Sequence, residues 1–336
     1  MTSYLEAISD IEPRMLKPSA KDIVIDARSG RISGAGLREG IALTTLRLAM
    51  RVLMPLRQFG FSYVARTVRT LLPSRRPMIF SLAPGALMRV PYCDAYWSIL
   101  LLPGYSYEHS TVVLLEAARD IDYGFVDGGA NYGYWSILAS GPEAGGKAAV
   151  AVEAAPDTFR VLEDNRVLND SRFSVLNRAI GATSGQHVRI FGAKHEARTT
   201  VDPADGSRPI LECDTISLDD IAALPQFAGL DKFIVKLDVE GVEIAAFSGA
   251  ARLLAGDTVF VYEDHGSDLD HATTRHALDV LKLRVFWLGR GRRQEITSPT
   301  QLAAIKKSRR FGYDMVATNS PFWIERLERL VDGSPE

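Results

Sequence analysis

Residues 125–135 read FVDGGANYGYW, a short apolar run followed by small residues and then by the start of a helical pattern. A strand that passes through a glycine-rich turn directly into a helix is typical of an open, parallel α/β sheet. Gly128 and Gly129 allow positive φ angles and a close approach of the backbone to a ligand, and Gly133 allows tight contact between helix and strand. The stretch predicts a ligand-binding turn or, as the plainer interpretation, an ordinary glycine-rich turn.

Beyond this turn the chain alternates short β-branched runs with helical stretches. The predicted strands are residues 125–127, 148–153, 173–177, 233–238, 259–263 and 285–288. The predicted helices are residues 135–140, 158–168, 244–254 and 273–281. Because this alternation implies right-handed crossovers, we predict an α/β fold with a doubly wound, mostly parallel sheet, within a domain covering residues 99–330. Residues 199–211 are rich in Pro, Asp and Gly and predict a loop.

The N-terminal part has a different composition. Residues 1–38 mix Pro, Gly and charge without periodicity, which predicts a poorly ordered arm. Residues 39–98 predict a basic amphipathic helical extension, because apolar residues recur at helical spacing within residues 41–72 and residues 40–93 contain eight arginines and no Asp or Glu. One interpretation is that residues 40–76 lie on an anionic membrane or bind an acidic substrate. The other is a helical appendage packed on the main domain, and the sequence leaves both open.

Bulk composition excludes several classes of protein. The 336 residues are 46% hydrophobic and 24% charged, so the chain can bury a full core. A net charge of −2 gives no argument for a polyanionic partner, and we expect no nucleic-acid partner. The two cysteines lie far apart in neither CxxC nor CxxH spacing, which excludes a thiolate zinc site and a disulfide framework. With no signal-like start and no run of 18 apolar residues, we expect a cytoplasmic protein, or one peripheral on the inner face of a membrane.

Polar residues follow three of the predicted strands at the edge where ligands bind in an open parallel sheet. Asp127 precedes the glycines, and Asn131 breaks the GxGxxG pattern of a dinucleotide site. A carboxylate disfavours a pyrophosphate there and favours a cofactor that carries an α-ammonium group. Glu153 ends the next strand, where one carboxylate can accept hydrogen bonds from both hydroxyls of a ribose. Asn177 ends the third strand and could meet an adenine edge or form an ordinary turn.

Ionisable residues crowd the ends of two further strands. They are Lys236, Asp238, Glu240 and Glu243 in IVKLDVEGVE, residues 234–243, and Glu263, Asp264 and His265 in VYEDH, residues 261–265. Charged ends of buried strands converge on one edge of the sheet, where they could provide a general base or metal ligands. The alternative is a structural salt-bridge network of Lys236 with Glu240 or Glu243.

These blocks together resemble the FkbM family of class I, S-adenosylmethionine-dependent methyltransferases. The matching pieces are GYSYE at 104–108, VDGGANYG at 126–133, Val152-Glu153 with Pro156 and Asn165, ISLDD at 216–220, IVKLDVEGVE at 234–243 with Gly249, and Glu263 near His265. The resemblance covers roughly residues 100 to 290, and the block KLDVEGVE is its most specific piece. It implies a Rossmann-like, seven-stranded sheet whose last strand, near residues 314–318, is antiparallel.

The resemblance also implies methyl transfer from S-adenosyl-L-methionine to a hydroxyl oxygen, with a small molecule, a sugar, a glycan or a glycolipid as the acceptor. The cofactor-binding residues we predict are Glu108, Asp127, Gly128, Gly129, Ala130, Asn131, Gly133, Glu153, Asn177 and Asp238. On the acceptor side we predict Asp238, Glu240, Glu263 and His265, one of them the general base, and we assign no metal ligand.

Two other functions remain open. A metal-dependent hydrolase could use the cluster of Asp238, Glu240, Glu263, Asp264 and His265. A non-enzymatic scaffold could bind the cofactor and dock on a membrane or a partner through its basic segment. A NAD-dependent oxidoreductase is disfavoured because Asn131 breaks the dinucleotide pattern.

Overall fold

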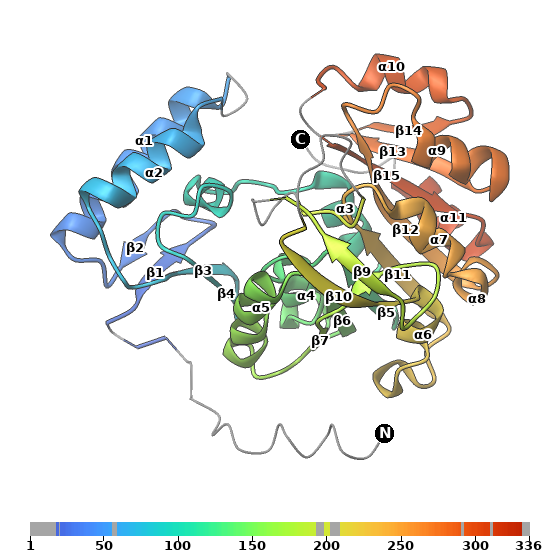
Figure 1. Cartoon of the computed structure of the whole chain (residues 1–336), viewed down its shortest axis with the longest axis horizontal. Helices are drawn as coiled ribbons and strands as arrows, with labels where there is room; N and C mark the ends of the chain where they lie inside the picture. Colours follow the sequence, from blue (N-terminus) through green and yellow to red (C-terminus); the bar gives the residue numbers. More distant parts are fainter. Residues whose placement is uncertain are drawn as a thin grey trace. The chain divides into compact units, whose positions relative to one another are not determined.

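The computed structural model describes residues 18–19, 21–55, 59–192, 198–201, 209–289, 292–309 and 312–330. The chain forms two compact units, residues 1–104 with 163–171 and residues 105–162 with 172–336. Figure 1 follows the elements along the sequence by colour. No helix in the described part of the chain is long and apolar enough to cross a bilayer.

The first unit has a four-stranded sheet of its own, in the order β2-β1-β3-β4. Its strands are β1 (Ile23–Asp26), β2 (Ile32–Ser33), β3 (Met78–Ala83) and β4 (Ala86–Val90), and its helices are α1 (Leu37–Leu53) and α2 (Phe61–Leu71). In contrast to the poorly ordered arm predicted for residues 1–38, residues 21–38 contain two strands, because Ile23 and Ile25 alternate into the core. Residues 1–17 of that arm lie outside the described residues. The extension predicted as helical also contains β3 and β4.

The second unit is built on one large sheet in the order β14-β13-β15-β12-β11-β5-β6-β7. Its strands are β5 (Gly124–Gly128), β6 (Ala148–Val152), β7 (Ser174–Leu176), β11 (Lys232–Leu237), β12 (Asp257–His265), β13 (Arg284–Gly289), β14 (Arg292–Ile296) and β15 (Gly312–Thr318). Strands β7, β6, β5, β11 and β12 are parallel, and β15 lies antiparallel between β12 and β13. The predicted α/β, Rossmann-like fold with an antiparallel last strand is confirmed. The seven-stranded prediction lacked β14, which forms a hairpin with β13.

Helices pack on both faces of this sheet. They are α3 (His109–Ala117), α4 (Tyr134–Ala139), α5 (Pro156–Leu168), α6 (Leu218–Ala222), α7 (Glu243–Ser248), α8 (Ala251–Leu254), α9 (Ala272–Arg275), α10 (Leu302–Ile305) and α11 (Pro321–Arg329). On one face, α6, α7, α8 and α10 contribute to a single apolar core with the strands. The helix predicted over residues 244–254 is interrupted after Ser248, because the carbonyl of Gly249 accepts a hydrogen bond from Asp219 instead of continuing the helix.

A smaller sheet in the order β8-β10-β9 was not predicted from the sequence. Its strands are β8 (Ala179–Ile180), β9 (His187–Ile190) and β10 (Leu211–Ile216). β9 and β10 are antiparallel, and exposed charged residues alternate with apolar ones along them. Part of the predicted loop over residues 199–211, residues 202–208, lies outside the described residues.

Candidate active site

The glycine-rich turn lies between β5 and α4. A Cβ on Gly129 would lie 1.8 Å from the carbonyl oxygen of Asp238, and the φ of Gly129 is +73°. At Gly133, φ is +87° and a Cβ would lie 2.6 Å from Leu162 Cδ1. Both positions therefore require glycine. Gly128 differs from our expectation because its φ is not positive, and a side chain there is instead excluded by packing against β8.

The backbone amides of this turn already have acceptors inside the protein. Gly129 and Ala130 both donate to the carbonyl oxygen of the last residue of β6, at 3.0 and 2.9 Å. The amide of Asn131 donates to Oε2 of Glu153 at 3.0 Å, and that of Gly133 to the carbonyl of Ala130 at 2.8 Å. A pyrophosphate is bound by free amides at such a turn. These four amides are engaged, so the turn is poorly suited to a dinucleotide.

Glu153 is held in place by the turn that it faces. Its Oε1 accepts a hydrogen bond from the amide of Ala155 at 2.9 Å and its Oε2 accepts one from Asn131. A carboxylate can accept hydrogen bonds from hydroxyl groups, and these two contacts fix the position of the Glu153 carboxylate at the turn. Asn177 uses its Nδ2 to donate to the carbonyls of Glu153 and Ala154, at 2.8 and 3.0 Å. This is a turn-forming contact, and the role of Asn177 at an adenine edge stays a prediction.

Asp127 is buried at the end of β5 and connects this strand to α4. Its Oδ2 accepts hydrogen bonds from the amide and the hydroxyl of Ser136, at 3.0 and 2.8 Å. Burial raises the pKa of Asp127, and the nearby Lys236 opposes that rise. The contact that we predicted between Asp127 and an ammonium group stays a prediction.

Lys236 is the centre of a buried ion-pair network. Its Nζ lies 3.2 Å from Oδ2 of Asp238 and 3.3 Å from Oε2 of Glu108, and the latter oxygen also accepts a hydrogen bond of 2.6 Å from Trp135 Nε1. Burial disfavours the charged amine, but the carboxylates of Asp238, Glu108 and Asp127 outweigh it and raise the pKa of Lys236. The salt bridges considered above, with Glu240 or Glu243, are wrong. Lys236 and Asp238 are two residues apart along an extended chain, so their side chains share a face.

Glu240, Glu263 and His265 form an acidic cluster beside this network. His265 Nδ1 lies 3.5 Å from Oε2 of Glu263, and His265 Nε2 lies 3.7 Å from Oε1 of Glu243. Burial, reinforced by the charge of Asp238, raises the pKa of Glu240 to about 7 and that of Glu263 to about 9. The carboxylate of Glu243 contributes most to raising the pKa of His265 to about 9. One ligand atom from each of Glu240, Glu263 and His265 lies within 4.8 Å of the others, so these three could hold a metal ion.

This arrangement can be compared with known families. Residues 127–286 match the family model described as the methyltransferase FkbM domain. The chain carries an FkbM methyltransferase domain. The matched stretch contains the glycine turn, Glu153, the 234–243 block and His265, so the resemblance seen in the sequence is confirmed.

Solved structures similar to this chain include a methyltransferase FkbM from Methylobacillus flagellatus KT, with 15% identity and a TM-score of 0.37. The alignment covers 81% of this chain and 60% of that one. A precorrin-6y C5,15-methyltransferase from Geobacter metallireducens GS-15 has 16% identity and a TM-score of 0.36, over 64% of this chain and 90% of that one. No curated protein matches.

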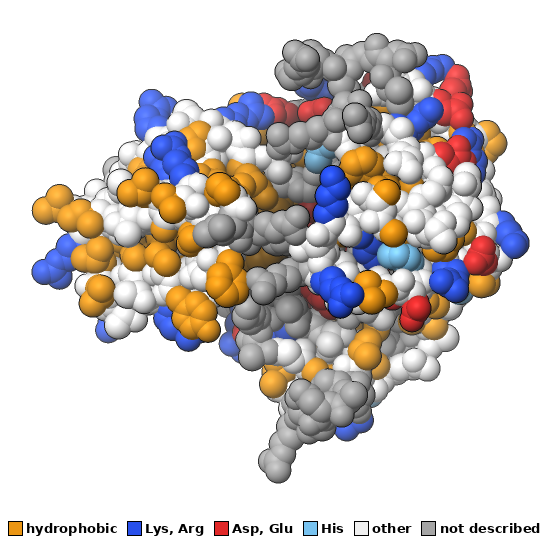
Figure 2. All heavy atoms as spheres, turned by 90° about the horizontal axis from the view of Figure 1, so that it is seen from above, with side chains coloured by type: hydrophobic (Ala, Val, Ile, Leu, Met, Phe, Trp, Pro, Cys, Tyr) orange, Lys and Arg blue, Asp and Glu red, His pale blue; other side chains and the backbone are white. Residues whose placement is uncertain are grey.

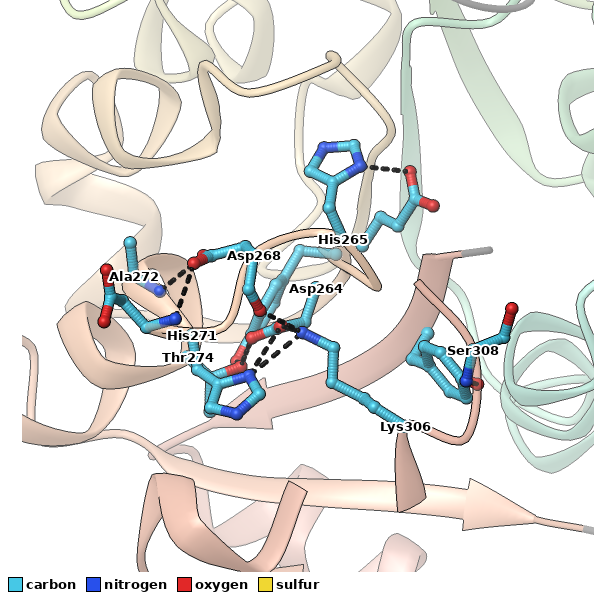
Figure 3. Close-up of polar contacts among 12 residues, drawn as sticks. Asp264, His265, Asp268, His271, Ala272, Thr274, Lys306 and Ser308 are labelled. Atoms are coloured by element: carbon cyan, nitrogen blue, oxygen red, sulfur yellow. Dashed lines mark hydrogen bonds and ion pairs between the residues drawn. The ribbon is translucent and has the colours of Figure 1, made fainter. Parts of the chain in front are cut away.

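Within the FkbM domain, the end of β12 directs its charged side chains to both faces of the sheet. Glu263 and His265 lie on the face of the acidic cluster, whereas Asp264 lies on the other face. Figure 3 shows His265 and Asp264 on opposite sides of the strand. Asp264 there contacts Lys306, Thr274 and His271, which removes it from the metal cluster proposed for a hydrolase. The strict alternation of side chains along a strand is the reason.

Besides Lys236, two residues near the acidic cluster were not assigned a role from the sequence, and both lie beyond the residues that match the family model. Asp314 on β15 lies opposite Glu263 in the antiparallel register, and burial raises its pKa. Gly312 leaves space for the same glutamate, since a Cβ there would lie 1.2 Å from Glu263 Oε1. An acidic residue inside the apolar strand GYDMVAT, residues 312–318, is a signal that could have identified Asp314.

A segment from outside the large sheet also reaches the acidic cluster. The hydroxyl of Thr199 donates a hydrogen bond of 2.6 Å to the carbonyl oxygen of Glu240. Glu240 itself adopts a φ of +53°, which is uncommon for a residue with a side chain. The contact with Thr199 therefore helps to fix the backbone of Glu240 in the FkbM domain.

Proposed function

We propose that this protein transfers a methyl group from S-adenosyl-L-methionine to a hydroxyl oxygen. The observation that carries the proposal is the turn formed by Gly129 and Asn131 against Glu153. The turn lies beside a carboxylate, and the backbone amides of residues 129, 130, 131 and 133 already donate hydrogen bonds within the protein, so these four amides do not bind a phosphate. A nucleoside cofactor without phosphates fits this donor and acceptor set, and a dinucleotide does not.

The groups of S-adenosylmethionine match the acceptors available at the end of the sheet. Its two ribose hydroxyls are donors, and Glu153 places a carboxylate, a hydrogen-bond acceptor, at the turn. Its ammonium group needs carboxylates, and Glu108, Asp127 and Asp238 converge around Lys236 near the turn. We therefore assign ribose binding to Glu153 and place the methionine part near Gly129 and Asn131.

S-adenosylmethionine supplies an activated methyl carbon, to which the acceptor oxygen bonds as the carbon–sulfur bond breaks. The protein must position the hydroxyl and accept its proton. At neutral pH, Glu263 and His265 hold their protons because both pKa values are raised to about 9. Asp238 is paired with Lys236 at 3.2 Å. Glu240, with a pKa raised to about 7, is the member of the cluster best suited to act as general base.

We propose a hydroxyl on a sugar, a glycan or a glycolipid as the acceptor. The cluster offers several hydrogen-bonding groups in a small space: Asp238 and Glu240 can accept hydrogen bonds, and the protonated Glu263 and His265 can also donate them. Adjacent hydroxyls on a sugar ring are donors spaced to use such a set. A small hydroxylated acceptor without a sugar ring would need fewer of these groups.

Calorimetric titration with S-adenosylhomocysteine tests the cofactor assignment. We expect saturable binding of S-adenosylhomocysteine and none of NAD. Transfer of a labelled methyl group to a panel of mono- and oligosaccharides, lipid-linked sugars and simple alcohols then tests the acceptor. Absence of S-adenosylhomocysteine binding would refute the proposal, and transfer to nitrogen or thiol acceptors alone would refute its acceptor class.

A metal-dependent hydrolase is the second candidate, because Glu240, Glu263 and His265 could hold a divalent ion. Ester hydrolysis that requires Mg²⁺ or Mn²⁺, is lost with a chelator and does not respond to S-adenosylhomocysteine would favour it. Methyl transfer that persists in the chelator would exclude a metal from the reaction.

A further inference from the structure

Helix α1 presents two apolar faces, of which only one is covered. Ala42, Leu43, Leu46 and Met50 are fully buried. Leu37, Ile41, Leu48 and Val52 are between 50% and 84% exposed. At 100° per residue, these four exposed side chains fall within an arc of about 60°, roughly opposite the buried set. A helix that only packed on its own unit would carry polar residues along this stripe.

Helix α2 repeats the pattern on a shorter scale. Phe61, Ala65 and Val68 are buried, whereas Tyr63 and Leu71 are more than 70% exposed. Scattered exposed apolar residues are common on soluble proteins. A continuous stripe on one helix followed by further exposed apolar residues on the next is the pattern of an interaction surface.

The exposed charged side chains described on α1 and α2 are all arginines, because Glu39 on α1 is buried. Residues 40–93 contain no Asp or Glu. Arg47 and Arg76 are used inside the unit, the first by the carbonyl of Gly30 and the second by Glu39. Arg51, Arg66, Arg69 and Arg75 are exposed, and no carboxylate among the described residues forms an ion pair with them.

Figure 2 shows orange and dark-blue side chains gathered over the α1–α2 part of the chain. Exposed apolar side chains interspersed with arginines match the two layers of a lipid surface, acyl chains below and anionic headgroups above. A protein partner would need a complementary apolar groove with an acidic rim. An anionic bilayer offers an apolar region and negative charge without needing a complementary shape.

We propose that the α1–α2 face, made of Leu37, Ile41, Leu48, Val52, Tyr63 and Leu71 with the neighbouring exposed arginines, docks on an anionic lipid surface. The apolar side chains enter the region between headgroups and acyl chains, and the arginines contact lipid phosphates and carboxylates. The docking is peripheral and reversible, because the buried face of α1 remains packed on its own unit.

Co-sedimentation of the full chain with vesicles tests the proposal. We expect binding to vesicles of phosphatidylcholine with phosphatidylserine, weaker binding to pure phosphatidylcholine, and a fall in binding as salt is raised. Leu48→Ser with Val52→Ser should reduce the partition coefficient at least about tenfold, by removing apolar surface from the bilayer. Arg51→Gln and Arg66→Gln should each reduce it about fivefold.

Matched controls come from the second unit. Leu269 and Val280 are as exposed as Leu48 and Val52, so Leu269→Ser with Val280→Ser removes similar apolar surface elsewhere and should leave binding unchanged. No binding of the unaltered chain to anionic vesicles, or equal losses in both double variants, would overturn the proposal. A dimer in light scattering that Leu48→Ser with Val52→Ser converts to a monomer, without vesicle binding, would assign the face to a second copy. The measurement needs neither cofactor nor acceptor and is independent of the proposed function.

Discussion

The amide of Asp238 donates a hydrogen bond of 2.9 Å to the carbonyl oxygen of Gly128, at the point where β5 and β11 end. The segments that follow these two parallel strands are therefore in direct backbone contact, and the carbonyl of Asp238 fills the space where a side chain on Gly129 would lie. This contact couples the glycine turn to the acidic block through rigid groups. A shift of one loop would move both the proposed cofactor residues and the proposed acceptor residues.

Gly129→Ala should disrupt this backbone contact. The new Cβ would lie 1.8 Å from a carbonyl oxygen that cannot rotate away, and the φ of +73° adds strain. Gly185→Ala is the matched control, since its φ is +78° but no atom lies within 4 Å of the added carbon. We expect the control to lose about 1 kcal/mol in urea unfolding and Gly129→Ala to lose about 3 kcal/mol or more. Equal losses would show that φ strain alone matters at Gly129.

Glu153→Gln should weaken the binding of S-adenosylhomocysteine by about ten- to a hundredfold, because hydrogen bonds from ribose hydroxyls to a charged carboxylate contribute about 1.5–3 kcal/mol. Glu212→Gln on β10, an exposed carboxylate, is the control and should leave the dissociation constant unchanged. Calorimetry of both variants measures the effect, with thermal melts to establish that they fold. If the affinity of Glu153→Gln were unaltered, Glu153 would serve only to hold the turn.

The pH dependence of methyl transfer should identify the general base. A base acts when deprotonated, so kcat/KM should rise with pH through about 7 if Glu240 accepts the proton, and level off above it. With His265 or Glu263 as base, the rise would instead be centred at about 9. Glu240→Gln should abolish the rise near 7 and leave S-adenosylhomocysteine binding intact. A profile that keeps its inflection near 7 in this variant would exclude Glu240.

The large sheet was predictable because each buried parallel strand carries its own apolar, β-branched run, a local property of the sequence. The convergence of Asp238, Glu263 and His265 followed from the same rule about strand ends. The pairing of Lys236 with Glu108 was not predictable, since it joins residues that only the folded sheet brings together. The separation of Asp264 from Glu263 follows from the alternation of side chains along β12, but only the folded sheet shows which of the two faces the acidic cluster.

The first unit was predicted less well for a related reason. The short strand β1 pairs in parallel with β3, more than fifty residues later, and neither has a turn or motif that marks the pairing. The basic amphipathic character of α1 and α2 is a local pattern and was visible. Only the structure shows which arginines of the basic segment are engaged, such as Arg47 on α1 and Arg76 after α2.

Lys306→Met should destabilise the fold without affecting the proposed site. The Nζ of Lys306 contacts Asp264, whose side chain is fully buried, and donates a hydrogen bond of 2.9 Å to the carbonyl of Asp268 (Figure 3). Removing the amine leaves a buried carboxylate without its cation, which costs about 3–5 kcal/mol. Lys307→Met alters the neighbouring exposed lysine and should change the unfolding free energy by less than about 0.5 kcal/mol.

Urea unfolding of the two lysine variants measures the difference, and calorimetry with S-adenosylhomocysteine shows whether the site is affected. Because Asp264 faces away from Glu263 and His265, the affinity should be the same in both variants. If the folded Lys306→Met variant bound S-adenosylhomocysteine much more weakly, the contacts of Asp264 on one face of β12 would influence the proposed site on the other face. An unfolding free energy equal to that of Lys307→Met would mean that the buried pair of Lys306 and Asp264 contributes little to stability.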